Sequence, residues 1–220
     1  MAGTDRQGIT HALVDGYGRT YAEEAGIRMR DTPQPLYRLL VLADLLSARI
    51  RADVALAAAR ELSAAGMRDP RAMADATWQQ RVDALGRGGY RRYDESTATR
   101  LGEGAELAQR RYGGDLRRLR DDADGDVEGI RGRLRDFPGI GPAGADIFLR
   151  EAQAVWPQIA PYFGDKAEQG ARTLGLPSSP GKLADLADGA DTEPAVLAAA
   201  LVRVSLDRKA PGAVREAARG

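Results

Sequence analysis

Apolar residues recur at helical spacing along most of the chain, and no stretch shows the strict alternation that is typical of a half-buried strand. The most apolar segment is 36–48, where leucine and alanine dominate, so it predicts a buried helix. The same periodicity predicts further helices over 10–27, 54–65, 70–75, 78–86, 94–112, 115–120, 166–174, 193–206 and 210–218, with a short one around 183–187. The sequence therefore predicts an all-α fold.

The most informative segment is a short glycine turn between two amphipathic patterns. Apolar residues recur over 127–137 and again over 147–155, with the run Pro-Gly-Ile-Gly at 138–141 between them. Gly139 and Gly141 have no Cβ, so both permit a positive φ and a close approach by another backbone. The pattern predicts two helices joined by a hairpin. Its turn amides and second helix N-terminus can bind an anion such as a DNA phosphate. A purely structural turn is the alternative.

An acidic run precedes this hairpin, at Asp121, Asp122, Asp124, Asp126 and Glu128. Oxygen ligands suit calcium, but the spacing lacks the closing glutamate of a calcium-binding loop. We therefore expect a solvated loop that caps the first hairpin helix, rather than a metal site.

The overall charge does not point to a nucleic acid, because the chain has 32 basic and 32 acidic residues. A DNA-binding surface would have to be a local patch. The absence of cysteine excludes disulfides, thiol catalysis and thiolate-bound iron–sulfur clusters, and the single histidine, His11, excludes a histidine-rich metal site. The start of the chain lacks a signal-peptide pattern and no run approaches ~18 apolar residues, so we expect a cytoplasmic protein.

The run 134–146, with Phe-Pro-Gly-Ile-Gly at its centre, resembles the helix-hairpin-helix of the endonuclease III-like (HhH-GPD) DNA glycosylases. Weaker matches follow in the family's order: Leu-Leu-Ser-Ala at 45–48, Gly-Gly-Tyr at 88–90 and Tyr-Gly-Gly-Asp-Leu at 112–116. Together the matches cover about 36–176. They imply the two-lobed helical fold of that family.

The resemblance implies a six-helix lobe over 36–156, with the helix-hairpin-helix at about 126–156, and a second lobe built from 1–35 and 157–220. It implies that double-stranded DNA is the partner. A damaged or mispaired base would be flipped out of the duplex, and its N-glycosidic bond would be hydrolysed. We expect a monomeric, nucleoid-associated protein.

Members of that family use an aspartate in the loop after the hairpin. Asp165 is the only carboxylate in that loop here, a few residues beyond the family's position. Its alternative role is to cap a helix that begins at Lys166. Bifunctional members form a Schiff base through a lysine at the start of the second hairpin helix, where this chain has Pro142 and Ala143. The resemblance therefore implies a monofunctional enzyme, unless Lys166 supplies an amine.

Further DNA contacts are expected from the same resemblance. Arg49 and Ile50 lie where relatives place the side chain that fills the gap left by a flipped base, and an exposed loop is the alternative. Tyr162 and Phe163 are candidates for stacking on that base, with core packing as the alternative. The phosphate would be held by the hairpin residues Gly139, Ile140, Gly141, Ala143 and Gly144.

Several arginines of the central region could contact phosphates or simply lie on solvated helix faces: Arg87, Arg91, Arg92, Arg110 and Arg111. No cofactor is expected, although carbonyls of such a turn can hold a potassium or sodium ion in the family. Two other functions stay open. One is a non-catalytic DNA-binding protein with a degenerate glycosylase fold, and the other is a helical protein-interaction module.

Overall fold

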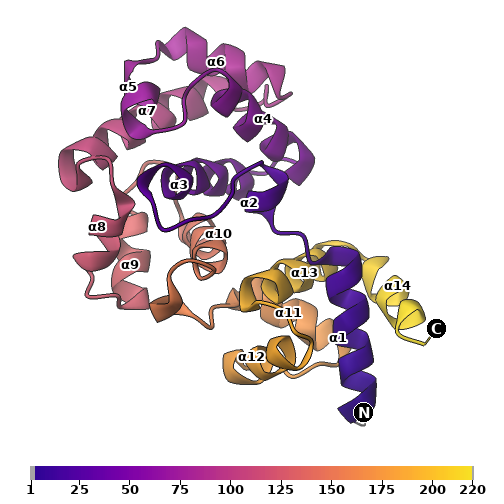
Figure 1. Ribbon diagram of the computed structural model, residues 1–220. Helices are drawn as coiled ribbons and strands as arrows, with labels where there is room; N and C mark the ends of the chain where they lie inside the picture. Colours follow the sequence, from indigo (N-terminus) through magenta and orange to yellow (C-terminus); the bar gives the residue numbers. More distant parts are fainter. Residues whose placement is uncertain (1–2, 220) are drawn as a thin grey trace. The chain divides into compact units, whose positions relative to one another are not determined.

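The computed structural model describes residues 3–219, which form α-helices and a 3-10 helix with no strand among them, so the all-α prediction is confirmed (Figure 1). The chain divides into two compact units. Ala22–Val155 forms one unit, and Met1–Tyr21 with Trp156–Gly220 forms the other. The predicted hairpin lies in the first of these units, whereas the loop that contains Asp165 lies in the second.

This division differs from the predicted lobes at the N-terminal boundary, which falls after Tyr21 instead of after residue 35. Residues 1, 2 and 220 of the predicted second lobe lie outside the described residues. The single helix predicted over 10–27 is wrong, because α1 (Gly3–Tyr17) ends early and α2 (Tyr21–Glu24) is separate. Gly18 and Thr20, which lie between them, are poor helix formers.

The unit Ala22–Val155 contains the hairpin and most of the other predicted helices, whose bounds agree with the prediction within a few residues. These helices are α3 (Pro33–Ser47), α4 (Ala52–Ala64), α5 (Pro70–Asp75), α6 (Trp78–Arg87), α7 (Asp94–Tyr112), α8 (Leu116–Asp121), α9 (Val127–Leu134) and α10 (Pro142–Ala152). Helix α3 contacts both α4 and α10, and α7 contacts α5, α6 and α8 (Figure 1).

Helix α3 is the core helix of this unit. Every residue from Leu39 to Leu45 is buried, as expected of a helix that is apolar all round. Asp44 is the one charged residue in that stretch, and only 4% of its surface is exposed. The carboxylate is therefore removed from water together with its apolar neighbours.

The two hairpin helices are fixed by a cap and an ion pair. The Asp126 carboxylate accepts a hydrogen bond of 2.7 Å from the Gly129 amide, which confirms the predicted cap of α9. Arg131 on α9 lies 3.1 Å from Asp146 on α10. The cap fixes the start of α9, and the ion pair joins α9 to α10 across the hairpin.

The other unit consists of α1, η1 (Pro157–Ile159), α11 (Gly164–Leu174), α12 (Pro180–Gly189), α13 (Pro194–Leu206) and α14 (Ala210–Ala217). Helix α13 is its core helix, and contacts α1, α11, α12 and α14. Among the described residues, no helix has both the length and the apolar character needed to cross a membrane.

Candidate functional site

The hairpin turn is formed by residues 137–140. The Ile140 amide donates a hydrogen bond of 3.0 Å to the Phe137 carbonyl, and Gly139 has a φ of 87°. Proline at the second position and a positive φ at the third are the features of a type II β-turn. The structure therefore confirms that Gly139 takes the left-handed conformation, which other residues adopt only with strain.

The side chains on either side of this turn anchor it to the unit. The Phe137 ring stacks on Tyr112 with the ring centroids 6.1 Å apart, and Ile140 is 5% exposed. A Cβ built on Gly144 would lie 3.3 Å from Ile140 Cδ1, so the isoleucine packs tightly on the first turn of α10. The turn is thus held by apolar contacts on both of its sides.

Gly141 differs from Gly139. Its φ of −87° and ψ of −171° are extended, so Gly141 does not use the positive φ that glycine permits. The residue precedes Pro142, and a following proline favours extended backbone. A Cβ built on Gly141 would have no atom within 4 Å. Within the described residues, nothing therefore requires glycine at this position, and the space beside it is open.

Several amides of the hairpin are free to bind an anion. No hydrogen bond within residues 3–219 uses the amides of Gly139, Gly141, Ala143 or Gly144. The last two belong to the first turn of α10, where amides lack intrahelical acceptors and the helix dipole favours negative charge. Ala143 is exposed, but Gly144 is buried beside Ile140 and Ser47, so Gly144 is a correction to the predicted set. Ile140 is a correction to the predicted set, because its amide is used within the turn and its side chain is buried.

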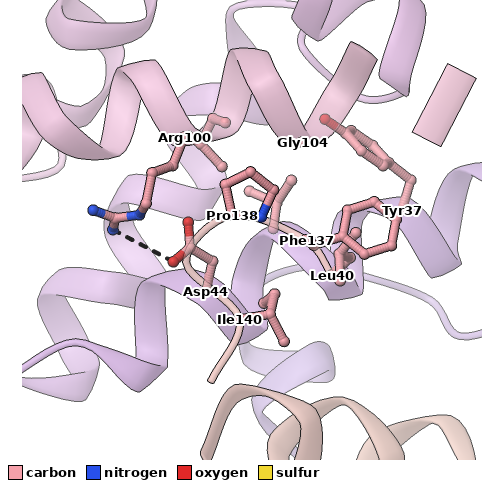
Figure 2. A pocket seen from close by; sticks show the side chains of 10 residues that line it. Tyr37, Leu40, Asp44, Arg100, Gly104, Phe137, Pro138 and Ile140 are labelled. Atoms are coloured by element: carbon pink, nitrogen blue, oxygen red, sulfur yellow. Dashed lines mark hydrogen bonds and ion pairs between the residues drawn. The ribbon is translucent and has the colours of Figure 1, made fainter. Parts of the chain in front are cut away.

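An ion pair lies directly beneath the turn (Figure 2). Arg100 Nη2 on α7 is 3.4 Å from Asp44 Oδ1 on α3 and 3.0 Å from Thr97 Oγ1. A Cβ built on Gly139 would come within 2.6 Å of Arg100 Nε and would collide with the Asp44 carboxylate. The glycine is therefore required because the pair approaches its backbone so closely.

Burial raises the pKa of Asp44 from 3.8 to about 6, and the neighbouring Arg100 opposes part of that rise. Sequence reasoning missed both residues of this pair. The available signal was a lone carboxylate within the most apolar helix of the chain. Their separation of 56 residues gave no indication that Arg100 would be the partner.

A small cavity beneath the turn has a volume of about 20 Å³ and is lined mainly by apolar side chains, among them Tyr37, Leu40, Leu101, Phe137 and Ile140. Ligand pockets are usually ~300 Å³ or more. This cavity can hold at most a water molecule. It is therefore a packing defect beneath the turn and does not offer room for a nucleobase.

Arg49 and Ile50 were expected beside the flipped base, and the structure places the start of their loop next to the hairpin. A Cβ on Gly144 would lie 3.6 Å from Ser47 Cβ, so the loop begins beside the first turn of α10. Arg49 is exposed and Ile50 is partly exposed. The arginine and the free amides therefore belong to one region of the unit.

Charge around the hairpin is partly neutralised by acidic partners. Arg111 lies 2.6 Å from Asp136, and Arg131 pairs with Asp146. Arg135, in contrast, is exposed, and its side chain forms no ion pair or hydrogen bond with a described residue. Arg49 and Arg135 are therefore exposed arginines of this unit whose side chains have no acidic partner among the described residues.

Most of the other arginines that were candidates for phosphate contacts already interact with neighbouring side chains. Arg87 lies 3.0 Å from Glu61, and Arg110 lies 3.1 Å from Glu106. Arg92 stacks over the Tyr93 ring at 5.2 Å from its centroid. An arginine that already has a carboxylate partner contributes less net charge to a phosphate surface, so these side chains are weaker candidates than Arg49.

The predicted catalytic residues lie at the start of α11, in the other unit. Asp165 is exposed in the first turn, and no hydrogen bond or ion pair within residues 3–219 uses its carboxylate. The alternative role as a helix cap is wrong, because α11 begins at Gly164 with Phe163 as the capping residue and no side-chain cap. Lys166 Nζ donates a 3.3 Å hydrogen bond to Gln169 on the exposed face of the same helix.

The predicted base-stacking residues Tyr162 and Phe163 are buried, with 8% and 1% of their surfaces exposed. The structure therefore shows packed side chains at these two positions and no open stacking face. The alkali-metal ion that such a turn can hold in the family is not tested by the structure. The carbonyls of Phe137 and Gly141 each accept one hydrogen bond, from Ile140 and Ala145.

No protein-family model matches this chain, and a search of curated proteins finds no match either. The resemblance to endonuclease III-like glycosylases therefore stays a hypothesis, which depends on the hairpin and on the order of the weaker motifs.

Proposed function

We propose that the protein binds double-stranded DNA, and that the hairpin at 137–144 holds a backbone phosphate through its amides. One observation carries the proposal. The amides of Gly139, Gly141 and Ala143 lack partners within the described residues, and they lie on one short turn and the start of the helix that follows it. Unpaired amides at a helix N-terminus favour an anion, and a phosphate contact positions DNA without reading its sequence.

The surroundings of the turn support a nucleic acid over a protein partner. Arg49 and Arg135 are exposed near the hairpin, and neither side chain forms an ion pair or hydrogen bond within residues 3–219. Local positive charge is what a chain with no net charge needs for binding to a phosphate backbone. The open space beside Gly141 would allow that backbone to approach the amides closely.

Gly141→Val tests this function without disturbing the fold. The extended backbone of Gly141 suits valine, a Cβ there would have no described atom within 4 Å outside the adjacent residues, and the added side chain would occupy the open space through which a phosphate is proposed to approach. We expect duplex affinity to fall about tenfold or more for any sequence, on the scale of lost charge-assisted hydrogen bonds.

Gly181→Val is the matched control. Gly181 also lies at a helix N-terminus next to a proline, and a Cβ there meets nothing within 4 Å. Duplex affinity is measured by fluorescence anisotropy at several salt concentrations, with thermal melting as the check on folding. If a folded Gly141→Val protein binds duplexes as tightly as the wild type, the hairpin does not contact DNA.

A second candidate function is hydrolysis of an N-glycosidic bond. The observation that favours it is Asp165, an exposed carboxylate without a partner in the described residues. An ionised carboxylate can stabilise positive charge that develops on a deoxyribose or can activate water. In this proposal Asp165 acts on a base flipped out of the bound duplex, and no amine is available at Pro142 or Ala143 for strand cleavage.

A further inference from the structure

We propose that the Arg100 guanidinium supplies positive charge to the phosphate site at the hairpin. Asp44 holds this guanidinium in place and neutralises part of its charge. The inference rests on the proposed DNA-binding function. It assigns a role to a pair of residues that no sequence motif marks.

The first support is the position of the guanidinium. Arg100 Nε would lie 2.6 Å from a Cβ on Gly139, so the guanidinium lies beside the residue whose amide is free for a phosphate. Figure 2 shows the Arg100 side chain reaching from α7 to the Asp44 carboxylate beside Pro138. A phosphate that contacts the turn would therefore lie near this charge.

The second support is that Arg100 has spare capacity to donate hydrogen bonds. Its Nη1 lies on the exposed side of the group and has only a 3.5 Å contact with Ser96 Oγ, so Nη1 is the atom that can donate to a ligand, whereas Nε is buried. The Arg100 side chain is 29% exposed, whereas that of Asp44 is 6% exposed. The arginine is thus the member of the pair that a ligand can reach.

The third support is the rigidity of the pair. Asp44 lies in the fully buried stretch of α3, and it accepts from Arg100 Nη2, which also donates to Thr97. An arginine held in this way loses little side-chain entropy when a phosphate binds. The Asp44 carboxylate, in return, cancels part of the field that Arg100 exerts on the phosphate.

Two substitutions should therefore have opposite effects. Arg100→Gln should weaken binding about tenfold and lower the slope of log affinity against log salt by about one, as expected for the loss of one phosphate contact. Asp44→Asn should tighten binding roughly threefold or more, because the arginine is then no longer neutralised. A residue that only stabilises the fold would not change the salt slope or increase the affinity.

The experiment measures anisotropy of a fluorescent duplex over a salt series for the wild type, both single variants and the double variant. The double variant Asp44→Asn/Arg100→Gln leaves no charge beneath the turn, so it remains informative if Arg100→Gln alone does not fold. Its salt slope should also be lower by about one. Arg71→Gln, which removes an exposed arginine from α5 in the same unit, is the control and should keep the wild-type slope.

Wild-type salt slopes in the folded double variant, or weaker binding by folded Asp44→Asn, would overturn the role of Arg100. If DNA binding falls for Gly141→Val but the slope does not respond to Arg100, only this inference fails. If the wild type does not bind duplex DNA, the proposed function fails and the inference fails with it.

Discussion

The buried carboxylate of Asp44 predicts an unusual dependence of stability on pH. Its pKa is raised to about 6 in the folded protein, from 3.8 in an exposed carboxyl. A carboxyl with a raised pKa binds protons more tightly in the folded state than in the unfolded state. Folding should therefore become more favourable as the pH falls through 6, whereas a carboxylate stabilised by its neighbours has the opposite effect.

The magnitude follows from the two pKa values. At pH 7 the carboxyl is ionised in both states and contributes little to the pH dependence. At pH 5 it is largely protonated in the folded protein but largely ionised in the unfolded chain, and this difference stabilises the fold by roughly 1.3 kcal/mol relative to pH 7. If the free energy of unfolding falls by ~3 kcal/mol per molar urea, the urea concentration at the unfolding midpoint would be about 0.4 M higher at pH 5 than at pH 7.

Another shifted carboxyl titrates outside this window. A hydrogen bond from Arg117 lowers the pKa of Asp115 below 3.8, so the stability it contributes is present above that pH and is lost only in stronger acid. Urea unfolding is therefore followed at pH 5 and pH 7 by tryptophan fluorescence and circular dichroism. Trp78 lies in the same unit as Asp44, whereas Trp156 lies in the other unit, so the fluorescence is measured on a Trp156→Phe background in which Trp78 is the signal.

Asp44→Asn isolates the contribution of this group, because asparagine does not titrate. The difference between the midpoints at pH 5 and pH 7 should be larger in the wild type than in the variant by the amount given above. If both proteins show the same difference, Asp44 does not have a raised pKa, and its burial costs less than the structure indicates.

Two further predictions concern the turn and the chemistry. Gly139→Ala should destabilise the protein by more than ~1 kcal/mol in urea unfolding, because the methyl group would collide with the Asp44–Arg100 pair at a positive φ. Gly132→Ala, in open space on α9, should instead be neutral or stabilising, and equal effects would refute the close approach at the turn. Asp165→Asn should keep duplex binding but slow base release from a lesion-containing duplex by ~100-fold or more in single-turnover assays. An unchanged rate would exclude Asp165 from catalysis.

The helices of this protein were largely predictable because their apolar periodicity is strong and glycine or proline marks most of their ends. The missed boundary lies at 18–20, where the break between α1 and α2 depends on weak local propensities. The partners of α3 were not predictable, because helical periodicity shows that a face is buried but not which helices cover it.

The candidate site was predictable where local backbone chemistry decides the conformation. Pro138-Gly139 is a strong signal for a type II turn, and Pro142 accounts for the extended backbone of Gly141. The Asp44–Arg100 pair depends instead on the packing of α3 against α7 and the hairpin, and tertiary packing of this kind leaves no local pattern. Burial of Tyr162 and Phe163 is likewise a tertiary property.

The fold requires glycine at one of the two hairpin positions, Gly139, but not at the other, Gly141. Gly139 is required by its positive φ and by the ion pair that approaches its backbone, so its presence is explained without any ligand. Gly141 meets neither condition, since its backbone is extended and a side chain would enter open space. In the proposed function, the absent side chain at Gly141 gives a phosphate access to the amides at the start of α10. A substitution at Gly141 therefore tests the proposed phosphate contact, whereas a substitution at Gly139 would change the fold and the contact together.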